Sequence, residues 1–301
     1  MKGLLVAALT LGCACVEPER QPPPPTRAME TTLPVFSPPA GFTRLRIGLV
    51  PVLEPETMRV SHQNLAAYLS RVLSVPVEVV VPERYAEALA QLERGDFDLV
   101  SLPPLAYVEA SRRMKLNCLV QTIADGSATA AGYLFVRDDS PRRTLEDLKG
   151  ATFAFVDPMS ASGSLMAEKL FKDHGFDLQR DLGRVEYLGN HEAVLKAVMS
   201  GKVEVGATYQ GAFSSHWRAS GEDPLALRVV AKTQRSPRDI LCLRDEVPKE
   251  VGHVITSALL ALSSRDRVAR EVLRPLHLNG YQPARPESYD GVRAAAAELR
   301  P

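Results

Sequence analysis

The sequence lacks an excess of charge of either sign. Its 301 residues include 36 lysines and arginines against 36 aspartates and glutamates, so the formal net charge at pH 7 is zero. Proteins that bind nucleic acids neutralise phosphates with a basic surface, and this composition offers no such field. We therefore expect no nucleic-acid partner.

Cysteine is also scarce, with four residues in the chain. Cys13 and Cys15 lie near the start, which leaves Cys118 and Cys242 in the part with a globular pattern. Two cysteines exclude a disulfide-dense scaffold and a zinc site built from cysteines. A disulfide between them in an oxidising compartment stays open as an alternative to two buried free thiols, which we favour.

The motifs of common enzyme classes are missing as well. There is no Walker A lysine, no H-E-x-x-H and no cluster of metal-ligating residues, and no serine stands in a G-x-S-x-G elbow. A serine hydrolase would also need an acid that orients a histidine, and the sequence identifies none. We predict a protein that is not an enzyme and uses no cofactor or metal.

The first 43 residues read as an export signal and a tether. An apolar run over residues 4–11 follows a lysine and is too short to span a bilayer, so residues 1–12 are expected to be a signal peptide. Small residues before Cys13 resemble the lipobox of bacterial lipoproteins, in which the cysteine is lipidated; Cys15 is a second candidate, and a plain cleaved signal is the alternative. Residues 13–43 are rich in proline and predict a semi-rigid tether.

The rest of the chain alternates apolar strands with helices. Strands are expected at 45–50, 77–81, 97–102, 116–122, 133–136, 151–156, 184–188 and 203–208, with helices at 61–73, 85–94, 105–113, 191–198 and 294–299. This order predicts an α/β protein whose parallel sheets are covered by helices. Segments 92–99 and 198–205 share one pattern of helix end, glycine stop and strand, which suggests two lobes of similar construction.

One loop has the composition of an anion site. A strand that ends at Val156 leads through Ser160, Ala161, Ser162 and Gly163 into a helix. A helix start offers unpaired N–H groups and the positive end of the macrodipole, and the serine hydroxyls add donors. The alternative is that one serine merely caps the helix. Ligands of such folds bind beyond the carboxyl ends of parallel strands, so we expect this loop to face a cleft.

Several stretches resemble a known family. The runs Asp157-Pro158-Met159-Ser160-Ala161-Ser162-Gly163, Gly189-Asn190-His191 and Ser236-Pro237-Arg238-Asp239-Ile240 are similar to motifs of the phosphate/phosphite/phosphonate-binding proteins of ABC transporters, as is the stretch from Tyr85 to Ala110. The resemblance covers residues 45–290 in order. It implies a bilobed, type II periplasmic-binding-protein fold whose two α/β lobes have mixed, mainly parallel sheets and are joined by two hinge strands.

The resemblance also implies a division of the chain and a place for the ligand. Lobe 1 would comprise residues 44–131 and 236–301, and lobe 2 residues 132–235. The two lobes would close around an anion. The crossings between them are expected within residues 132–137 and 229–243.

The family's Ser-Thr-Ser-Gly anion loop falls on Ser160, Ala161, Ser162 and Gly163. Alanine stands where the family has threonine, so one hydroxyl donor is missing. His191 matches the family histidine that touches the anion; a hydrogen bond to backbone is its alternative role.

Three further residues complete the expected site. Tyr107 matches an aromatic residue of the opposite lobe, with a place in the core as its alternative. Asp239 matches a carboxylate that pairs with the amine in aminophosphonate binders, with a turn cap as its alternative. Tyr209 is expected at a strand end that faces the cleft and has no family counterpart.

The resulting prediction is a lipid-anchored, monomeric solute-binding protein on the periplasmic side of a bacterial membrane. It would capture phosphonate, phosphite or phosphate between its lobes and deliver the anion to an ABC permease. The alternative is a sensing protein for another small anion that presents its closed form to a signalling partner.

Overall fold

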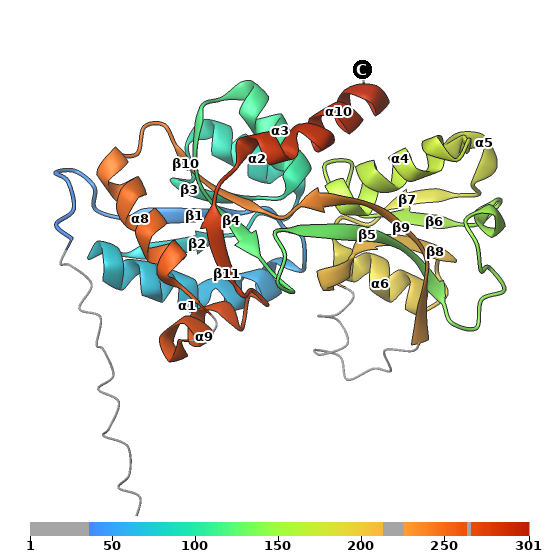
Figure 1. The fold of residues 1–301 in the computed structure, drawn as a ribbon, viewed down its shortest axis with the longest axis horizontal. Helices are drawn as coiled ribbons and strands as arrows, with labels where there is room; N and C mark the ends of the chain where they lie inside the picture. The colour runs from blue at the N-terminus through green and yellow to red at the C-terminus, as the bar shows by residue number, and fades with distance from the viewer. Residues whose placement is uncertain (1–35, 213–225, 264–265, 301) are drawn as a thin grey trace, which may run out of the picture. The chain divides into compact units, whose positions relative to one another are not determined.

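The structure is a computed structural model, and its description covers residues 36–212, 226–263 and 266–300 (Figure 1). The predicted signal peptide, Cys13 and most of the predicted tether lie outside these ranges, so they stay predictions. Within the described ranges, no helix combines the length and apolar composition that a membrane span requires.

Lobe 1 is built on a six-stranded sheet with the order β11-β4-β10-β3-β1-β2. Its first part contains β1 (Leu45–Leu49), α1 (Pro55–Leu73), β2 (Val77–Val80), α2 (Tyr85–Arg94), β3 (Leu99–Leu102), α3 (Pro104–Arg113) and β4 (Leu116–Ile123). The chain returns to it with β10 (Ile240–Arg244), α8 (Lys249–Ala261), α9 (Arg267–Leu273), β11 (Gly280–Pro283), η4 (Pro286–Tyr289) and α10 (Asp290–Leu299).

Lobe 2 is built on a five-stranded sheet with the order β7-β6-β8-β5-β9. Its elements are β5 (Thr129–Arg137), η1 (Glu146–Leu148), β6 (Phe153–Phe155), η2 (Ala161–Leu165), α4 (Met166–Asp173), α5 (Leu178–Asp181), β7 (Val185–Tyr187), α6 (His191–Met199), β8 (Val205–Tyr209) and β9 (Leu227–Pro237). The η2 segment is one π-helical turn that runs directly into α4.

Both sheets are mixed, as expected, but they are not mainly parallel. Four of the nine strand pairs in the described residues are parallel and five are antiparallel. The long strands β5 and β9 run antiparallel from Thr129 opposite Pro237 to Arg137 opposite Leu227. The chain enters lobe 2 along β5 and leaves it along β9. The two strands therefore run in opposite directions and pair antiparallel. The crossings between the sheets therefore lie at residues 124–128 and 238–239.

Local sequence signals place the ends of several elements. Gly95 and Gly201 follow α2 and α6 with φ of 81° and 74°, the left-handed conformation in which glycine commonly ends a helix. Pro55 occupies the first turn of α1, where its missing N–H leaves no bond unmade. The Asn190 side chain caps α6 by accepting the Ala193 N–H at 2.8 Å.

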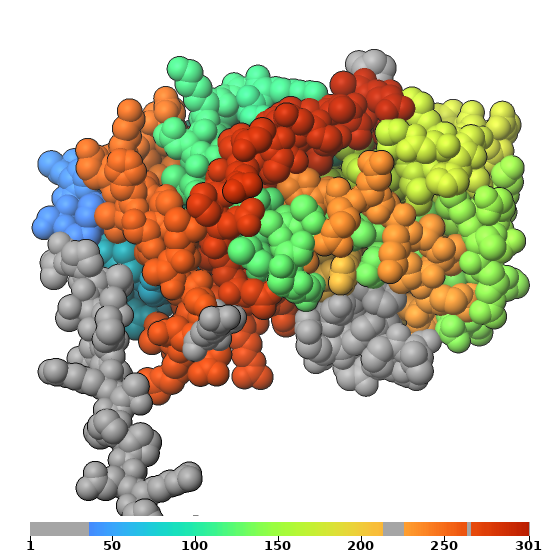
Figure 2. All heavy atoms as spheres, viewed as in Figure 1, coloured from blue at the N-terminus to red at the C-terminus, as the bar shows by residue number. Residues whose placement is uncertain are grey.

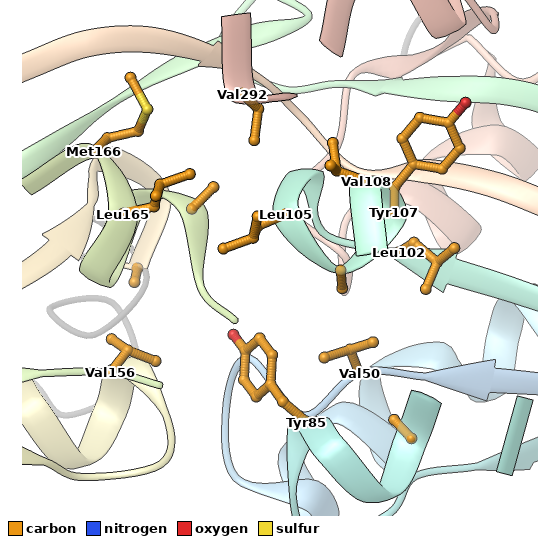
Figure 3. Packing of buried hydrophobic residues seen from close by; sticks show 14 of the residues in the cluster. Val50, Tyr85, Leu102, Leu105, Tyr107, Val108, Val156, Leu165, Met166 and Val292 are labelled. Carbon is orange, nitrogen blue, oxygen red and sulfur yellow. The ribbon is translucent and has the colours of Figure 1, made fainter. Parts of the chain in front are cut away.

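The apolar core joins the two lobes. One cluster lies within lobe 1, another within lobe 2, and a third combines Leu105 and Val108 of α3 with Val156 and Leu165 of lobe 2 and Val292 of α10 (Figure 3). Packing against both lobes gives α10 a larger role than the short surface helix predicted near the carboxyl end.

Helix α10 starts in lobe 1 and reaches the helix α4 of lobe 2. In Figure 2 its atoms, in red, run across the molecule onto the yellow-green surface of lobe 2. At the far end Arg300 forms a bidentate ion pair with Glu168, at 3.0 and 3.2 Å, and Glu298 lies 3.2 Å from Lys172. The lobes are thus fastened together beside the hinge strands.

Candidate functional site

A cavity of about 490 Å³ is lined by residues of both lobes. The wall includes the starts of η2 and α6, the end of β8, the crossing at residues 238–239 and the loop between β1 and α1. Six of the eight predicted ligand contacts line the cavity, namely Ser160, Ala161, Ser162, His191, Tyr209 and Asp239. Tyr107 and Gly163 are not part of this wall.

Ser160 caps the helix that begins with η2. Its Oγ accepts the Gly163 N–H at 3.1 Å, and its backbone has extended geometry with φ −82° and ψ 125°. The capping role that the sequence left as an alternative is therefore real. Since the hydroxyl accepts in this bond, its own proton remains available to a ligand in the cavity.

Gly163, which the resemblance placed in the anion loop, is engaged within the protein. Its amide is already engaged by the cap, and a Cβ at this position would lie 2.4 Å from a methyl group of Val156. Glycine is required here for close packing of the helix start on Val156, the residue that follows β6, rather than for the approach of a ligand.

Ala161 and Ser162 offer the donors that remain. Their N–H groups are the first of the helix and have no partner within it, and they lie at the positive end of its dipole. The Ser162 hydroxyl makes no hydrogen bond to any residue in the described ranges. These groups form a small set of neutral donors on one side of the cavity.

His191 stands opposite this loop at the start of α6. The side chain is 2% exposed, and its Nδ1 lies 3.0 Å from Thr208 Oγ1 at the end of β8. Burial lowers the pKa of His191 to about 3, so the ring is neutral at pH 7. Its Nε2 makes no hydrogen bond to the described part of the chain. The Tyr209 ring meets the imidazole edge to face, with centroids 4.8 Å apart.

The backbone of His191 also holds the lobes together at the cleft. Its N–H donates to the carbonyl of Val52 in lobe 1 at 3.0 Å. Beside it, Asn190 Nδ2 donates to Glu54 Oε1 at 3.1 Å. The lobes therefore touch across the mouth of the cavity, and the first amide of α6 is bonded to protein.

Tyr85 is a cavity residue that the site prediction missed. It begins α2 of lobe 1, and its hydroxyl points toward the chain of lobe 2 in Figure 3. That hydroxyl is buried near Ser160 but makes no hydrogen bond within the described residues. A buried, unsatisfied hydroxyl is unfavourable, so a ligand oxygen here would gain a ready donor. The sequence signal was the tyrosine at a helix start after a strand.

Tyr107 is corrected as a ligand contact. Its side chain is 3% exposed and packs edge to face on Tyr289, with ring centroids 4.8 Å apart. Figure 3 shows the ring directed away from lobe 2. The core role that the sequence left as an alternative is the one observed, because α3 turns this face toward η4 and α10.

Asp239 brings an unpaired carboxylate to the cavity. It lies at the crossing between β9 and β10, and its side chain has neither a hydrogen bond nor an ion pair among the residues described. Burial raises the pKa of Asp239 to about 6, and the nearby Arg238 only partly offsets this effect. An ionised carboxylate in such a place favours a cationic or donor group as its neighbour.

The cations of the wall are already paired. Arg238 lies 3.3 Å from Asp125 and Lys196 lies 2.7 Å from Glu192. The site therefore offers hydroxyl, amide and imidazole groups to an anion and one uncompensated carboxylate to a cation. No group of three or more potential metal ligands occurs in the described ranges.

Comparison with known proteins decides the family. Residues 47–289 match the profile of a family described as the periplasmic substrate-binding protein of phosphonate ABC transporters. The chain belongs to this family. A curated relative, the phosphate-import protein PhnD of Mycolicibacterium smegmatis, is 24% identical over 225 residues, which cover 70% of each chain.

Solved structures share the fold. PhnD1 from Prochlorococcus marinus, in complex with methylphosphonate, is 19% identical with a TM-score of 0.77 and covers 85% of this chain and 98% of its own. XAC2383 from Xanthomonas citri, bound to ATP, is 21% identical with a TM-score of 0.67 and covers 86% and 100%. The predicted bilobed α/β fold is thereby confirmed. As a member of this family, the phosphonate-binding protein is an extracytoplasmic substrate-binding component and not an enzyme.

Proposed function

We propose that this phosphonate-binding protein captures a phosphorus oxyanion that also carries an amine, and delivers it to an ABC permease. It acts as a monomer that is anchored to the membrane by a lipid on Cys13. Phosphonates are the first ligand class, with phosphite and phosphate as smaller relatives that would occupy the anion loop alone.

The donors around the loop support the anionic part of this proposal. The hydroxyls of Ser160, Ser162 and Tyr85 and the first amides of the helix converge on one cavity. In the tautomer whose Nδ1 accepts the Thr208 hydroxyl, Nε2 of His191 carries the proton and is a further donor. Three or four charge-assisted hydrogen bonds at about 1.5–3 kcal/mol each suffice for micromolar affinity, which needs ~8 kcal/mol plus the cost of association. Neutral donors satisfy this requirement without a dedicated cation.

The observation that carries the proposal is the unpaired carboxylate of Asp239 in the same cavity as the anion loop. A purely anionic ligand would leave this carboxylate without a partner and would be repelled by it. A zwitterion with an oxyanion at one end and an amine at the other satisfies both ends of the site.

Calorimetric titration of the purified protein tests the proposal. The ligands are methylphosphonate, 2-aminoethylphosphonate, phosphate, phosphite and sulfate. We expect 2-aminoethylphosphonate to bind more tightly than methylphosphonate. Binding of none of the phosphorus compounds would refute the assignment of the ligand class.

Matched variants separate the two ends of the ligand. Ser162→Ala should weaken every phosphorus ligand at least tenfold, whereas Ser200→Ala, which removes a hydroxyl bonded to the Ala197 carbonyl at the far end of α6, should weaken none. Asp239→Asn should abolish the preference for the amine, with the exposed Asp245→Asn as its control. A preference that survives in Asp239→Asn would place the amine elsewhere.

The anchor is tested by fractionation. Replacing Cys13 with serine should move the protein from the membrane fraction to the soluble fraction of the cell envelope. Retention of the Cys13→Ser variant in the membrane fraction would contradict lipidation at this residue.

A further inference from the structure

Two buried polar side chains face each other beside the anion loop. Thr208 is 0% exposed near the end of β8, and His191 is 2% exposed at the start of α6. Thr208 Oγ1 and His191 Nδ1 lie 3.0 Å apart, which is a hydrogen-bond distance. Since either atom could carry the proton of this bond, its direction follows only from what surrounds the pair.

The packing of α6 on β8 brings the two side chains together. Side chains two residues apart on a strand point to the same face, so Gly206 and Thr208 both face α6. A Cβ at Gly206 would lie 2.8 Å from a methyl group of Val194, so the helix approaches the strand closely. His191 precedes Val194 by three residues, about one helical turn, and therefore meets the next position on the same face of the strand.

The proton of the Thr208 hydroxyl decides the direction of the bond. A hydroxyl has one proton to donate, and a buried donor without an acceptor is unfavourable. Among the residues that the structure describes, His191 Nδ1 is the one acceptor that this hydroxyl meets. If Nδ1 carried a proton and donated it to Oγ1, the hydroxyl proton would be left without an acceptor. Thr208 therefore donates and Nδ1 accepts.

The charge of the ring agrees with this direction. A protonated imidazole has an N–H group at each nitrogen, so its Nδ1 could not accept a hydrogen bond. Burial lowers the pKa of His191 to about 3, which leaves the ring neutral at pH 7. In a neutral ring whose Nδ1 accepts, the one proton lies on Nε2.

The ring is also held in a fixed orientation. The Tyr209 ring packs edge to face on it, with centroids 4.8 Å apart, while the bond to Thr208 holds its Nδ1. His191 lines the cavity, and its Nε2 makes no hydrogen bond within the described ranges. The Nε2–H group is therefore left for a molecule in the cavity. In the opposite tautomer Nε2 would present a lone pair, which repels the oxygen of an anion.

We propose that Thr208 is a positioning residue for ligand binding. Its hydroxyl donates to Nδ1 and keeps the neutral ring of His191 in the tautomer whose Nε2–H donates to an unprotonated oxygen of the ligand. The inference rests on the proposed function, because that oxygen belongs to the phosphorus oxyanion. Thr208 thus decides which of two opposite roles, donor or acceptor, His191 has at the anion.

The tautomer is tested by ¹⁵N NMR of the purified protein with labelled histidine rings, because an imidazole nitrogen without a proton resonates far downfield of one that carries a proton. The His191 signals are identified by their absence in His191→Gln. At pH 7 without ligand we expect an unprotonated Nδ1 and a protonated Nε2. Addition of methylphosphonate should shift Nε2 more than Nδ1. A proton on Nδ1 in the ligand-free protein would overturn the inference.

Variants at Thr208 separate positioning from packing. Thr208→Val keeps the shape of the side chain without the hydroxyl, so both tautomers should be populated and the two nitrogen resonances should move toward each other. Methylphosphonate should then bind about three- to tenfold more weakly in a calorimetric titration. Thr208→Ser keeps the hydroxyl and should retain the wild-type signals and affinity. The control Thr256→Val, which removes a hydroxyl bonded to the Gly252 carbonyl in α8, should match the wild type in both measurements.

The outcomes distinguish this inference from the proposed function. If methylphosphonate binds without shifting Nε2, or binds to Thr208→Val as to the wild type, the inference is overturned and the proposed function stands. If no phosphorus compound binds, the proposed function is wrong and donation to the oxyanion falls with it. The ligand-free spectrum still shows in that case whether Nδ1 accepts. Should Thr208→Val fail to fold, the wild-type spectra with and without methylphosphonate decide the question.

Discussion

Replacing Asp239 with asparagine should stabilise the ligand-free protein at neutral pH. The carboxylate has no partner among the described residues, and its pKa rises from 3.8 to about 6 on burial. A difference of this size corresponds to at most about 3 kcal/mol, at ~1.4 kcal/mol per pKa unit. Because the side chain borders the cleft and is partly solvated, we expect about 1–2 kcal/mol.

The sign of the pH dependence follows from linkage. Above pH 6 the carboxylate is ionised in both the folded and the unfolded protein, so the folded state carries the whole cost of burying the charge. Below about pH 4 it is protonated in both states, and that cost vanishes. The advantage of Asp239→Asn should therefore be full at pH 7.5 and should disappear between pH 6 and pH 4.

Thermal unfolding of the wild type and Asp239→Asn, each without ligand, measures this difference. For a domain of this size 1 kcal/mol shifts the midpoint by ~2–4 °C, so we expect a gain of about 3–6 °C at pH 7.5 and none at pH 4. The control Asp245→Asn should show no gain at either pH. A stabilisation that is equal at both pH values, or a loss of stability at pH 7.5, would refute the reasoning.

Three further predictions concern other parts of the structure. Tyr85→Phe should leave the unfolding midpoint unchanged or raise it slightly, because the hydroxyl is unsatisfied, yet it should weaken phosphonate binding about five- to tenfold in a titration. Glu168→Gln breaks the bidentate pair with Arg300, and it should weaken ligand affinity two- to fivefold at low salt and less at 1 M salt. Cys118 and Cys242 face each other on β4 and β10 with sulfurs 3.1 Å apart, so treatment with diamide should join them, with loss of both thiols in a thiol titration and without dimer formation.

Much of the architecture could be predicted because its signals are local. The glycine stops at 95 and 201 and the strand-to-helix turn at 156–163 depend on residues adjacent in sequence. The share of parallel pairs could not be derived in this way. It depends on where β5, β9 and β10 insert among the other strands, which is a property of the whole topology.

In the candidate site, too, the features that depend on neighbouring residues could be predicted, and those that depend on distant contacts could not. The loop and the start of α6 could be identified from sequence, whereas the state of each donor could not. The Gly163 N–H donates to the side chain of Ser160, three residues earlier. The Tyr107 ring packs on Tyr289, which lies 182 positions later in the printed sequence. The lack of a partner for Asp239 depends likewise on every segment that packs around it.

The ion pairs between α10 and α4 of lobe 2 bear on the apparent affinity for the ligand. A protein of this kind binds with an apparent affinity that is its intrinsic affinity multiplied by the fraction of molecules already in the competent conformation. Ion pairs between α10 and α4 favour the arrangement of the lobes that is described here. If this arrangement is the binding-competent one, substitutions in the last turn of α10 should change the apparent affinity for all ligands by the same factor. The selectivity among ligands should then stay the same.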